Sequence, residues 1–296
     1  MNKSRLPILF FFYSFFFLSL FAVKANAIEK EEPTPNISQP PVDAPFITRW
    51  DLSKSTGLVT NQIYFNIAQS GNVSFTWQEV SPGSATGNGI VTDTSLTISN
   101  LPTNAIIDLS ISPTNLQGFF ISNGALVDVK QWGSTAWTGM NSAFSHCSNL
   151  EINAPDNPNL EGVTDMAYMF YQASAFNQDI GAWNVSNVTD MSNMFAEASA
   201  FNQNIGAWNV SNVTDMSNMF RKASVFNQDI GNWIVSNVTN MDAMFYQASA
   251  FNQNVGGWDV NLVTDMRDIF KGSAISLTNY DNILIAWDAA GYTNKD

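Results

Sequence analysis

The acidic side chains with the clearest chemical potential recur every 25 residues in the C-terminal half of the chain. Asp165, Asp190, Asp215 and Asp265 each follow a threonine, and Asn240 occupies the remaining position. Carboxylates that cleave polysaccharides work as one pair with two different roles, whereas this carboxylate is repeated at every level. We therefore expect these side chains to cap backbone N–H groups. Calcium binding is the alternative, but no EF-hand loop or G-G-x-G-x-D repeat accompanies them.

Few other side chains could carry out catalysis. The chain has one histidine, His146, and one cysteine, Cys147, which is too few for a Cys/His metal site. Cys147 follows Phe144 by three residues in an apolar pattern, so we expect a buried thiol. No G-x-S-x-G, H-E-x-x-H, phosphate-loop or dinucleotide motif is present. The sequence therefore predicts no catalytic residue, no metal and no cofactor.

These carboxylates belong to a repeat that organises the whole chain. Phe176, Phe201, Phe226 and Phe251 are each 25 residues apart, and the segments 176–200 and 201–225 differ at only four positions. A fixed period of this length is typical of a solenoid, in which neighbouring units stack to bury a common core. The four differences are Asp179/Asn204, Ala196/Arg221, Glu197/Lys222 and Ala200/Val225.

Each period predicts a short strand followed by a short helix. Within 182–186, Trp183 and Val185 alternate with polar or small residues, which predicts a strand with these two side chains inward. Met191, Met194, Phe195 and Ala198 then follow the i, i+3, i+4, i+7 spacing of a helix. The expected fold class is an α/β solenoid, a leucine-rich-repeat-like stack of strand-plus-helix units over 133–270.

The repeat also resembles a known family. The strings F-N-Q-D-I and W-N-V-S-N-V-T-D-M-S-N-M-F resemble the repeat of the BspA-type leucine-rich repeat surface proteins of bacteria, over about 140–270. The resemblance implies an extracellular, non-enzymatic solenoid, with some relatives acting as adhesins. It supplies no catalytic residues.

The best candidate for ligand binding is the outward column of the predicted strands. Stacked strands form one continuous face, and such faces bind partners. Plain solvated surface is the alternative. In contrast, we expect the recurring Asn177 and Gln178 positions to hydrogen-bond between turns and to serve the fold. The outward column comprises Asn184, Ser186, Asn209, Ser211, Ile234, Ser236 and Asp259.

The flanks of the repeat have their own patterns. Short alternating segments separated by Gly, Pro and Asn turns over 45–132 predict a small β-sandwich or β-cap domain. A carbohydrate-binding role for its aromatic residues is the alternative to a capping role, although Trp77 fits an inward alternation. Residues 271–296 contain Tyr280, Ile283, Leu284 and Trp287 at helical spacing. They predict a helix that is capped by Thr278 or Asn279, stops near Gly291 and covers the C-terminal end of the core.

The N-terminus predicts export. Residues 1–27 combine Lys3 and Arg5, an apolar run and the site Ala25-Asn26-Ala27, which is typical of a signal peptide; a retained membrane anchor is the alternative. Residues 28–44 are charged and proline-rich, which predicts a disordered linker. Removal of the signal peptide takes away three basic residues and changes the net charge from −13 to −16. Such a charge disfavours nucleic acid and anionic membranes as partners.

Together these patterns predict a secreted or cell-surface protein that acts as a non-enzymatic binding or adhesion module for an extracellular protein or glycan. We expect a monomer that does not insert into the membrane after signal cleavage. The alternatives are a solenoid polysaccharide lyase or hydrolase, and a purely structural spacer.

Overall fold

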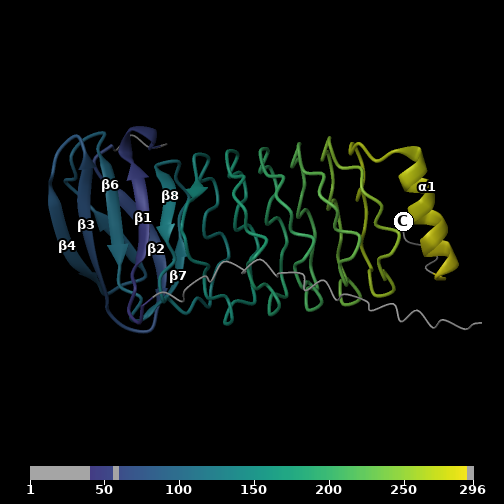
Figure 1. Ribbon diagram of the computed structural model, residues 1–296, viewed down its shortest axis with the longest axis horizontal. Coiled ribbons are helices and arrows are strands. Elements are labelled where there is room, and N and C mark those ends of the chain that lie inside the picture. Colours follow the sequence, from purple (N-terminus) through teal and green to yellow (C-terminus); the bar gives the residue numbers. More distant parts are fainter. Residues whose placement is uncertain (1–40, 56–59, 292–296) are drawn as a thin grey trace, which may run out of the picture. The chain divides into compact units, whose positions relative to one another are not determined.

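The computed structural model describes residues 41–55 and 60–291. The predicted signal peptide, and residues 28–40 of the predicted linker, lie outside the described residues. Two sheets come first, a run of coils follows, and the helix α1 (Leu277–Ala289) comes last (Figure 1). Within the described residues, no helix has the length and apolar character needed to cross a membrane.

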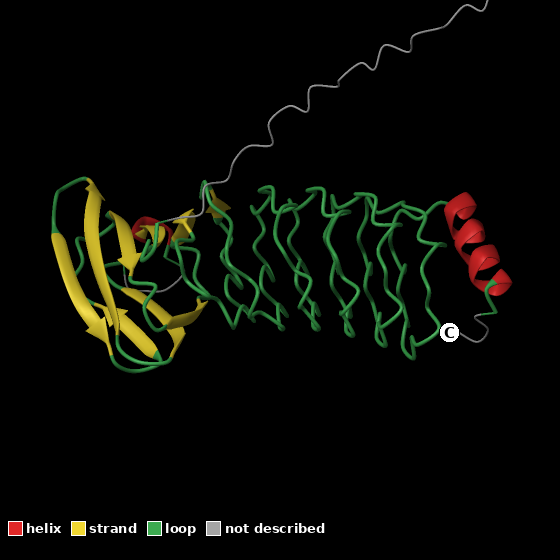
Figure 2. Ribbon diagram, turned by 60° about the horizontal axis from the view of Figure 1, so that its bottom comes forward, coloured by secondary structure: helices red, strands yellow, loops and turns green. Residues whose placement is uncertain are grey.

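The first part of the structure is built from antiparallel strands in two sheets (Figure 2). The strand β1 is followed by one 3₁₀ turn, Leu52–Lys54. The smaller sheet has the order β5 (Ser95–Ile98), β2 (Ile63–Gln69), β7 (Leu116–Phe120). The larger sheet has the order β4 (Thr86–Val91), β3 (Val73–Ser81), β6 (Ile106–Ile111), β1 (Phe46–Asp51), β8 (Leu126–Gln131), β9 (Glu151–Ile152).

Alternation of apolar residues places the core of this part between the sheets. Phe65 of β2 lies against Trp50 of β1 with ring centroids 6.1 Å apart, and Phe119 of β7 packs edge-on against Phe46 at 5.2 Å. The intervening residues of each strand point away from this core, because successive side chains in a strand alternate between faces. The larger sheet therefore has one buried face and one polar face.

The expected leucine-rich-repeat-like solenoid of alternating strand and helix units is wrong. Residues 133–270 are all described, and they contain no helix and only the two-residue strand β9. Successive coils instead lie side by side and meet at single parallel bridges (Figure 1). The bridges join Asp165 to Asp190, Asp190 to Asp215, Asp215 to Asn240, and Asn240 to Asp265.

Alternating hydrogen bonds explain why the predicted helix is absent. A helix needs consecutive N–H groups to bond within the chain, four residues back. Here Met194 N–H bonds to the Met191 carbonyl at 3.2 Å, but Phe195 N–H bonds to Met219 in the next coil at 2.9 Å. Asn193 and Glu197 have φ of 57° and 62°, which a right-handed helix excludes. The apolar residues at 191, 194, 195 and 198 are therefore buried by three overlapping tight turns, closed by the N–H groups of Met194, Ala196 and Ala198.

The predicted strand at 182–186 is also absent, although its alternation holds. Trp183 and Val185 are buried and Asn184 is exposed. The backbone, however, turns tightly on either side, with Trp183 N–H bonded to the Ile180 carbonyl and Val188 N–H bonded to the Val185 carbonyl. The pattern therefore indicated which side chains are inside but not the backbone conformation.

Aromatic columns fill the inside of the coils. Phe170, Phe195, Phe220 and Phe245 stack one above the next at 5.6–5.7 Å. A second column stacks against the first, as shown by Phe195 and Phe201 at 4.0 Å with planes 5° apart. The tryptophans are buried as expected, and Trp208 Nε1–H donates to the Ile180 carbonyl of the preceding coil at 3.1 Å. The second column comprises Phe176, Phe201, Phe226 and Phe251.

Polar columns satisfy the backbone at the coil corners. Asn177 Oδ1 accepts from the Asn202 N–H at 2.9 Å, and Gln203 Nε2 donates to the Asn177 carbonyl at 2.8 Å. The same pair of bonds repeats in the following coils, which confirms a structural role for these amides. The recurring acids are caps as expected, but of turns: Asp190 Oδ1 accepts from Ser192 N–H at 2.8 Å.

The helix α1 closes the end of this ladder. It begins after Ser276, whose Oγ accepts from Asn279 N–H at 3.2 Å, and not at Thr278 or Asn279 as expected. Ser276 N–H donates to Asn252 Oδ1 at 2.8 Å, and Asn279 Nδ2 donates to the Asn252 carbonyl at 2.7 Å. These two bonds replace those that the Asn backbone and the Gln side chain of a further coil would make. Ile283 and Trp287 are buried, whereas Tyr280 and Leu284 are exposed.

The sheets and the coils share one core. The Ile121 N–H bonds to the Ala143 carbonyl at 3.0 Å, and the Asn153 N–H bonds to the Val129 carbonyl of β8 at 3.1 Å. Buried apolar residues form a single cluster that extends from Phe46 to Trp287. Cys147 is buried within it, as expected, and burial raises the pKa of its thiol to about 12.

Replacing the buried Trp208 tests this packing. We expect Trp208→Ala to lower the free energy of unfolding by about 3–5 kcal/mol, because it opens a large cavity. It also removes the donor to the Ile180 carbonyl. Asn209→Ala, one residue on and exposed, should cost roughly 1 kcal/mol or less. Denaturant unfolding measures both, and equal losses would contradict the assigned inward and outward positions.

The exposed Ile234 gives a stabilising substitution. At the equivalent positions, Asn184 and Asn209 Oδ1 accept from the N–H two residues on, both at 3.2 Å, and an isoleucine cannot accept. Ile234→Asn should therefore raise the free energy of unfolding by about 0.5–1 kcal/mol. Ile234→Ala is the control, because it removes the same exposed apolar surface without adding an acceptor. Identical unfolding curves for the two variants would show that the turn hydrogen bond contributes nothing.

Candidate functional site

The predicted outward column lies on the surface, but several of its side chains already form hydrogen bonds within their own turns. Asn184, Asn209 and Asp259 are exposed, and each side chain accepts from the N–H two residues further on. Ser186, Ser211 and Ser236 are half-buried. The carbonyls of Ser186 and Ser211 accept from amide side chains of the next coil at 2.7 Å. Ile234 is 61% exposed. These residues occupy equivalent places in successive coils, and their role in ligand binding stays a prediction.

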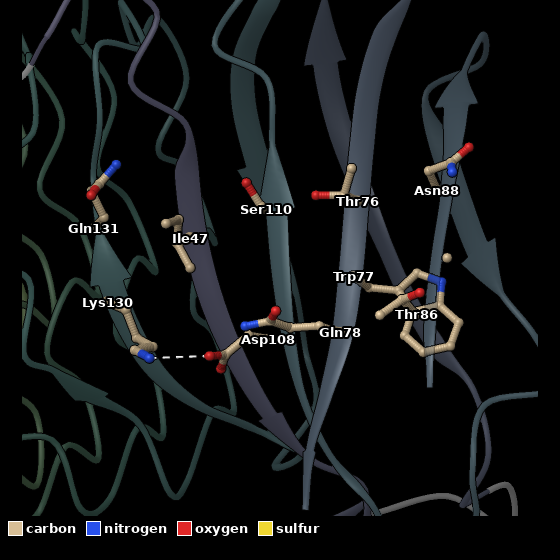
Figure 3. A pocket seen from close by; sticks show the side chains of 11 residues that line it. Ile47, Thr76, Trp77, Gln78, Thr86, Asn88, Asp108, Ser110, Lys130 and Gln131 are labelled. Carbon is tan, nitrogen blue, oxygen red and sulfur yellow. Dashed lines mark hydrogen bonds and ion pairs between the residues drawn. The ribbon is translucent and has the colours of Figure 1, made fainter. Parts of the chain in front are cut away.

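A second candidate lies on the polar face of the larger sheet. Here a hollow of about 700 Å³ opens across β4, β3, β6, β1 and β8, and Figure 3 shows its side chains coming from these strands. We call this the sheet hollow. Its lining consists of Ile47, Thr76, Trp77, Gln78, Thr86, Gly87, Asn88, Asp108, Ser110, Lys130 and Gln131.

Strand register aligns these side chains in two rows. In one row, Thr76 of β3 stands opposite Asn88 on one side and Ser110 on the other. In the next row, Gln78 stands opposite Thr86 and Asp108. Directly opposed residues on one face lie about 5 Å apart, so hydroxyl and amide groups from three strands lie close together. The sequence signal for this arrangement was the exposed alternation of Ser74, Thr76 and Gln78.

An ion network anchors the floor of the sheet hollow. Arg49 binds the carboxylate of Asp108 through two bonds, from Nε at 2.7 Å and from Nη2 at 2.9 Å, and Lys130 Nζ adds a third at 3.1 Å. Burial by itself would raise the pKa of Asp108, but the hydrogen bonds and charges of the two cations outweigh it and hold this pKa below its usual range. The bidentate geometry fixes both planar groups.

On the same face, the pKa of a second carboxylate is shifted in the opposite direction. Asp128 of β8 pairs with Arg49 across the sheet and with Glu151 of β9. Burial raises the pKa of Asp128, and hydrogen bonds from the backbone and side chain of Asn153 offset this only in part. The guanidinium of Arg49 therefore contributes to the environments of two carboxylates, one held firmly ionised and one more easily protonated.

Trp77 lies at one edge of the sheet hollow. Its ring covers Gly87 of the neighbouring strand, where a Cβ atom would lie 2.5 Å from the indole nitrogen. The close approach therefore requires glycine at this position. Trp77 follows the inward alternation of Val73 and Phe75 and packs against the core while staying half-buried, so its ring lies on the opposite face of the sheet from Gln78 and Thr86. The side chains that face the sheet hollow from β3 are therefore the polar Thr76 and Gln78.

This arrangement suits binding through hydrogen bonds. Hydroxyl and amide groups can donate and accept, and the anchored cations add directed N–H groups. Within residues 41–55 and 60–291, no group of three or more His, Cys, Asp or Glu side chains could hold a metal ion. Ser145 Oγ lies 2.8 Å from His146 Nδ1, but these residues belong to the first coil and are not among those that line the sheet hollow.

Comparison with known proteins identifies one family. No curated protein and no solved structure matches the chain. A family model described as "Mycoplasma protein of unknown function, DUF285" matches residues 114–217, 138–249 and 180–287. The matched region includes β7, β8, the coils and most of α1, whereas β1 to β6 lie outside it. Because these matches extend over 114–287, more than half of the 296 residues, the chain belongs to the DUF285 family.

Proposed function

We propose that the chain is a secreted or cell-surface binding protein without enzymatic activity, and that the sheet hollow is its contact site for a glycan. The observation that carries this proposal is the concentration of hydroxyl, amide and ion-paired groups in one hollow of the larger sheet. Glycans present many hydroxyl groups in fixed directions, and such ligands are recognised by a few well-placed polar groups beside apolar surface. Ile47 supplies that apolar surface.

The charge of the chain favours this ligand class over polyanions. The net charge is −13, and the two cations of the sheet hollow face two carboxylates, since Arg49 and Lys130 bind Asp108 and Arg49 also interacts with Asp128. A nucleic acid or an anionic membrane needs uncompensated positive charge, which this site does not offer. A neutral glycan needs only hydrogen-bond donors and acceptors, and these line the sheet hollow.

The coils support the proposal as a scaffold. Their recurring Asn, Gln, Thr and Asp side chains bond to the backbone of their own or the neighbouring coil. Groups used in this way are less accessible to a ligand or a substrate. In this proposal the adhesion role expected from the resemblance to surface repeat proteins lies in the sheet hollow, and the coils serve as its scaffold.

Glycan binding can be tested on the sheet hollow directly. A glycan array with the full chain identifies a ligand, and calorimetry measures its affinity. Thr76→Ala, Gln78→Ala and Asn88→Ala should each weaken binding about three- to tenfold, the equivalent of one lost hydrogen bond. The matched control is Thr97→Ala, an exposed threonine on β5 of the other sheet.

The same assay separates the two candidate sites. The triple variant Asn184→Lys, Asn209→Lys, Asp259→Lys changes the outward column of the coils and leaves the sheet hollow intact. Retained binding by the triple variant, with loss in the sheet-hollow variants, is the expected result. The reverse outcome would place the ligand on the coils and refute the role of the sheet hollow.

The two carboxylates predict opposite pH effects on stability. The folded-state pKa of Asp108 is lowered, so its stabilisation is present above the ordinary aspartate pKa and is lost as pH falls through the folded value. Asp108→Asn should therefore lower the unfolding temperature at neutral pH, with the deficit shrinking in acid. The folded-state pKa of Asp128 is raised, so Asp128→Asn should raise the unfolding temperature at neutral pH. Thermal melts across pH measure both, and shifts of the same sign would contradict the prediction.

A further inference from the structure

The repeated copies differ most at two adjacent positions. In the four copies that begin at Phe176, no residue type occurs twice at either position, and this holds for no other position of the repeat. One position carries Ala196, Arg221, Tyr246 and Lys271, and the next carries Glu197, Lys222, Gln247 and Gly272. The coil before them has Tyr171 and Gln172 at these places.

The structure explains why other positions stay the same. Recurring Asn, Gln, Trp and Thr side chains bond to the backbone of the preceding coil, and the recurring Phe side chains stack in the core. A change there would disturb the contact between coils. The two variable positions lie outside these columns, so the stack does not dictate their side chains.

The backbone at the second variable position favours glycine. Gln172, Glu197, Lys222 and Gln247 have φ of 57°, 62°, 57° and 56°, and Gly272 in the last coil has φ of 75°. Glycine adopts this left-handed conformation with the least strain, and Gly272 shows that a coil accepts it. Four successive coils nevertheless keep long polar side chains here. A left-handed backbone also recurs at Asn193, Asn218, Ala243 and Asp268, so it belongs to the coil turn itself. The feature particular to the second variable position is the long polar side chain that four coils place there.

These side chains form a connected surface. Gln172 Nε2 donates to Glu197 at 2.8 Å, and Glu197 also binds Arg221 at 2.9 Å and Lys222 at 3.0 Å. Burial by itself would raise the pKa of Glu197, but these bonds outweigh it and lower the pKa. Arg221 lies over the Tyr246 ring, 5.7 Å from its centroid. We call Tyr171, Gln172, Glu197, Arg221, Lys222 and Tyr246 the variable ridge.

We propose that the variable ridge is a second interaction surface, and that its partner is a protein. Tyrosine and arginine are enriched at protein interfaces and dominate their binding energy. Tyrosine also supplies contact area at a small cost in conformational entropy. Arg221 and Lys222 share the carboxylate of Glu197, which leaves one net positive charge on the ridge of a chain whose net charge is −13, far less than a polyanion requires. The ion pairs hold the side chains in place before the partner arrives, which lowers the entropic cost of binding.

Peptide selection on the full chain tests the surface. The probe is a phage-displayed library of random peptides, followed by affinity measurement with the enriched peptides. Tyr171→Ala and Tyr246→Ala should each weaken these peptides about tenfold or more. Gln78→Ala in the sheet hollow should leave their affinity unchanged. Peptides indifferent to both tyrosine variants, or dextran sulfate binding that depends on Arg221, would overturn the proposal.

A stability measurement tests the retained strain independently of any partner. Lys222→Gly and Gln247→Gly should raise the unfolding temperature, because glycine relieves the left-handed backbone, and should weaken the selected peptides. Ala250→Gly in the same corner region is the control; its backbone lacks a positive φ, so this change should lower the unfolding temperature. A lower unfolding temperature for both ridge variants would assign their side chains to the fold and refute the proposal.

Discussion

The coil stack depends on hydrogen bonds that leave each coil for the next. Every second N–H between Met191 and Glu197 bonds to the following coil, and the N–H groups between them close turns. This alternation favours a regular period, with donor and acceptor 24 residues apart between Phe195 and Met219. The first coil has one residue more, and there Phe144 N–H reaches the Met169 carbonyl, 25 residues on. The stacked phenylalanines and the amide columns depend on the same register. The near-identity of the copies is therefore a consequence of backbone geometry as much as of core packing.

Much of the inside and outside of the fold could be predicted from the sequence, but not its backbone. The alternation at Trp183 and Val185 and the spacing from Met191 to Ala198 correctly marked buried side chains. Periodicity reports burial, however, and gives no information about which carbonyl an N–H group reaches. The helix α1 was predictable because its hydrogen bonds are local, and only its start was wrong: Ser276 caps it. The coils were not predictable, because their hydrogen bonds connect residues 24 apart in the chain, as between Phe195 and Met219.

The candidate sites show the same limit. The sheet hollow requires Arg49 to meet Asp108, which lies 59 residues away, and only strand register brings them together. Polar alternation marks Thr76 and Gln78 as outward but does not say what they face. The outward column of Asn184 and Asn209 was visible in the sequence, whereas the hydrogen bonds that its side chains make to their own turns were not. The repeat is thus informative about the scaffold and less so about the ligand.

The way in which α1 caps the last coil at Asn252 has a consequence for the number of coils that the fold can hold. The hydrogen bonds that join α1 to the last coil use groups that every coil presents, since Ser276 and Asn279 bond to Asn252 as the next coil would. Asn177, Asn202 and Asn227 offer the same acceptors. Adding or removing one whole 25-residue unit would therefore leave the same hydrogen-bond partners for α1. Selection can therefore adjust the reach of the protein in coil-sized steps while its ends stay unchanged.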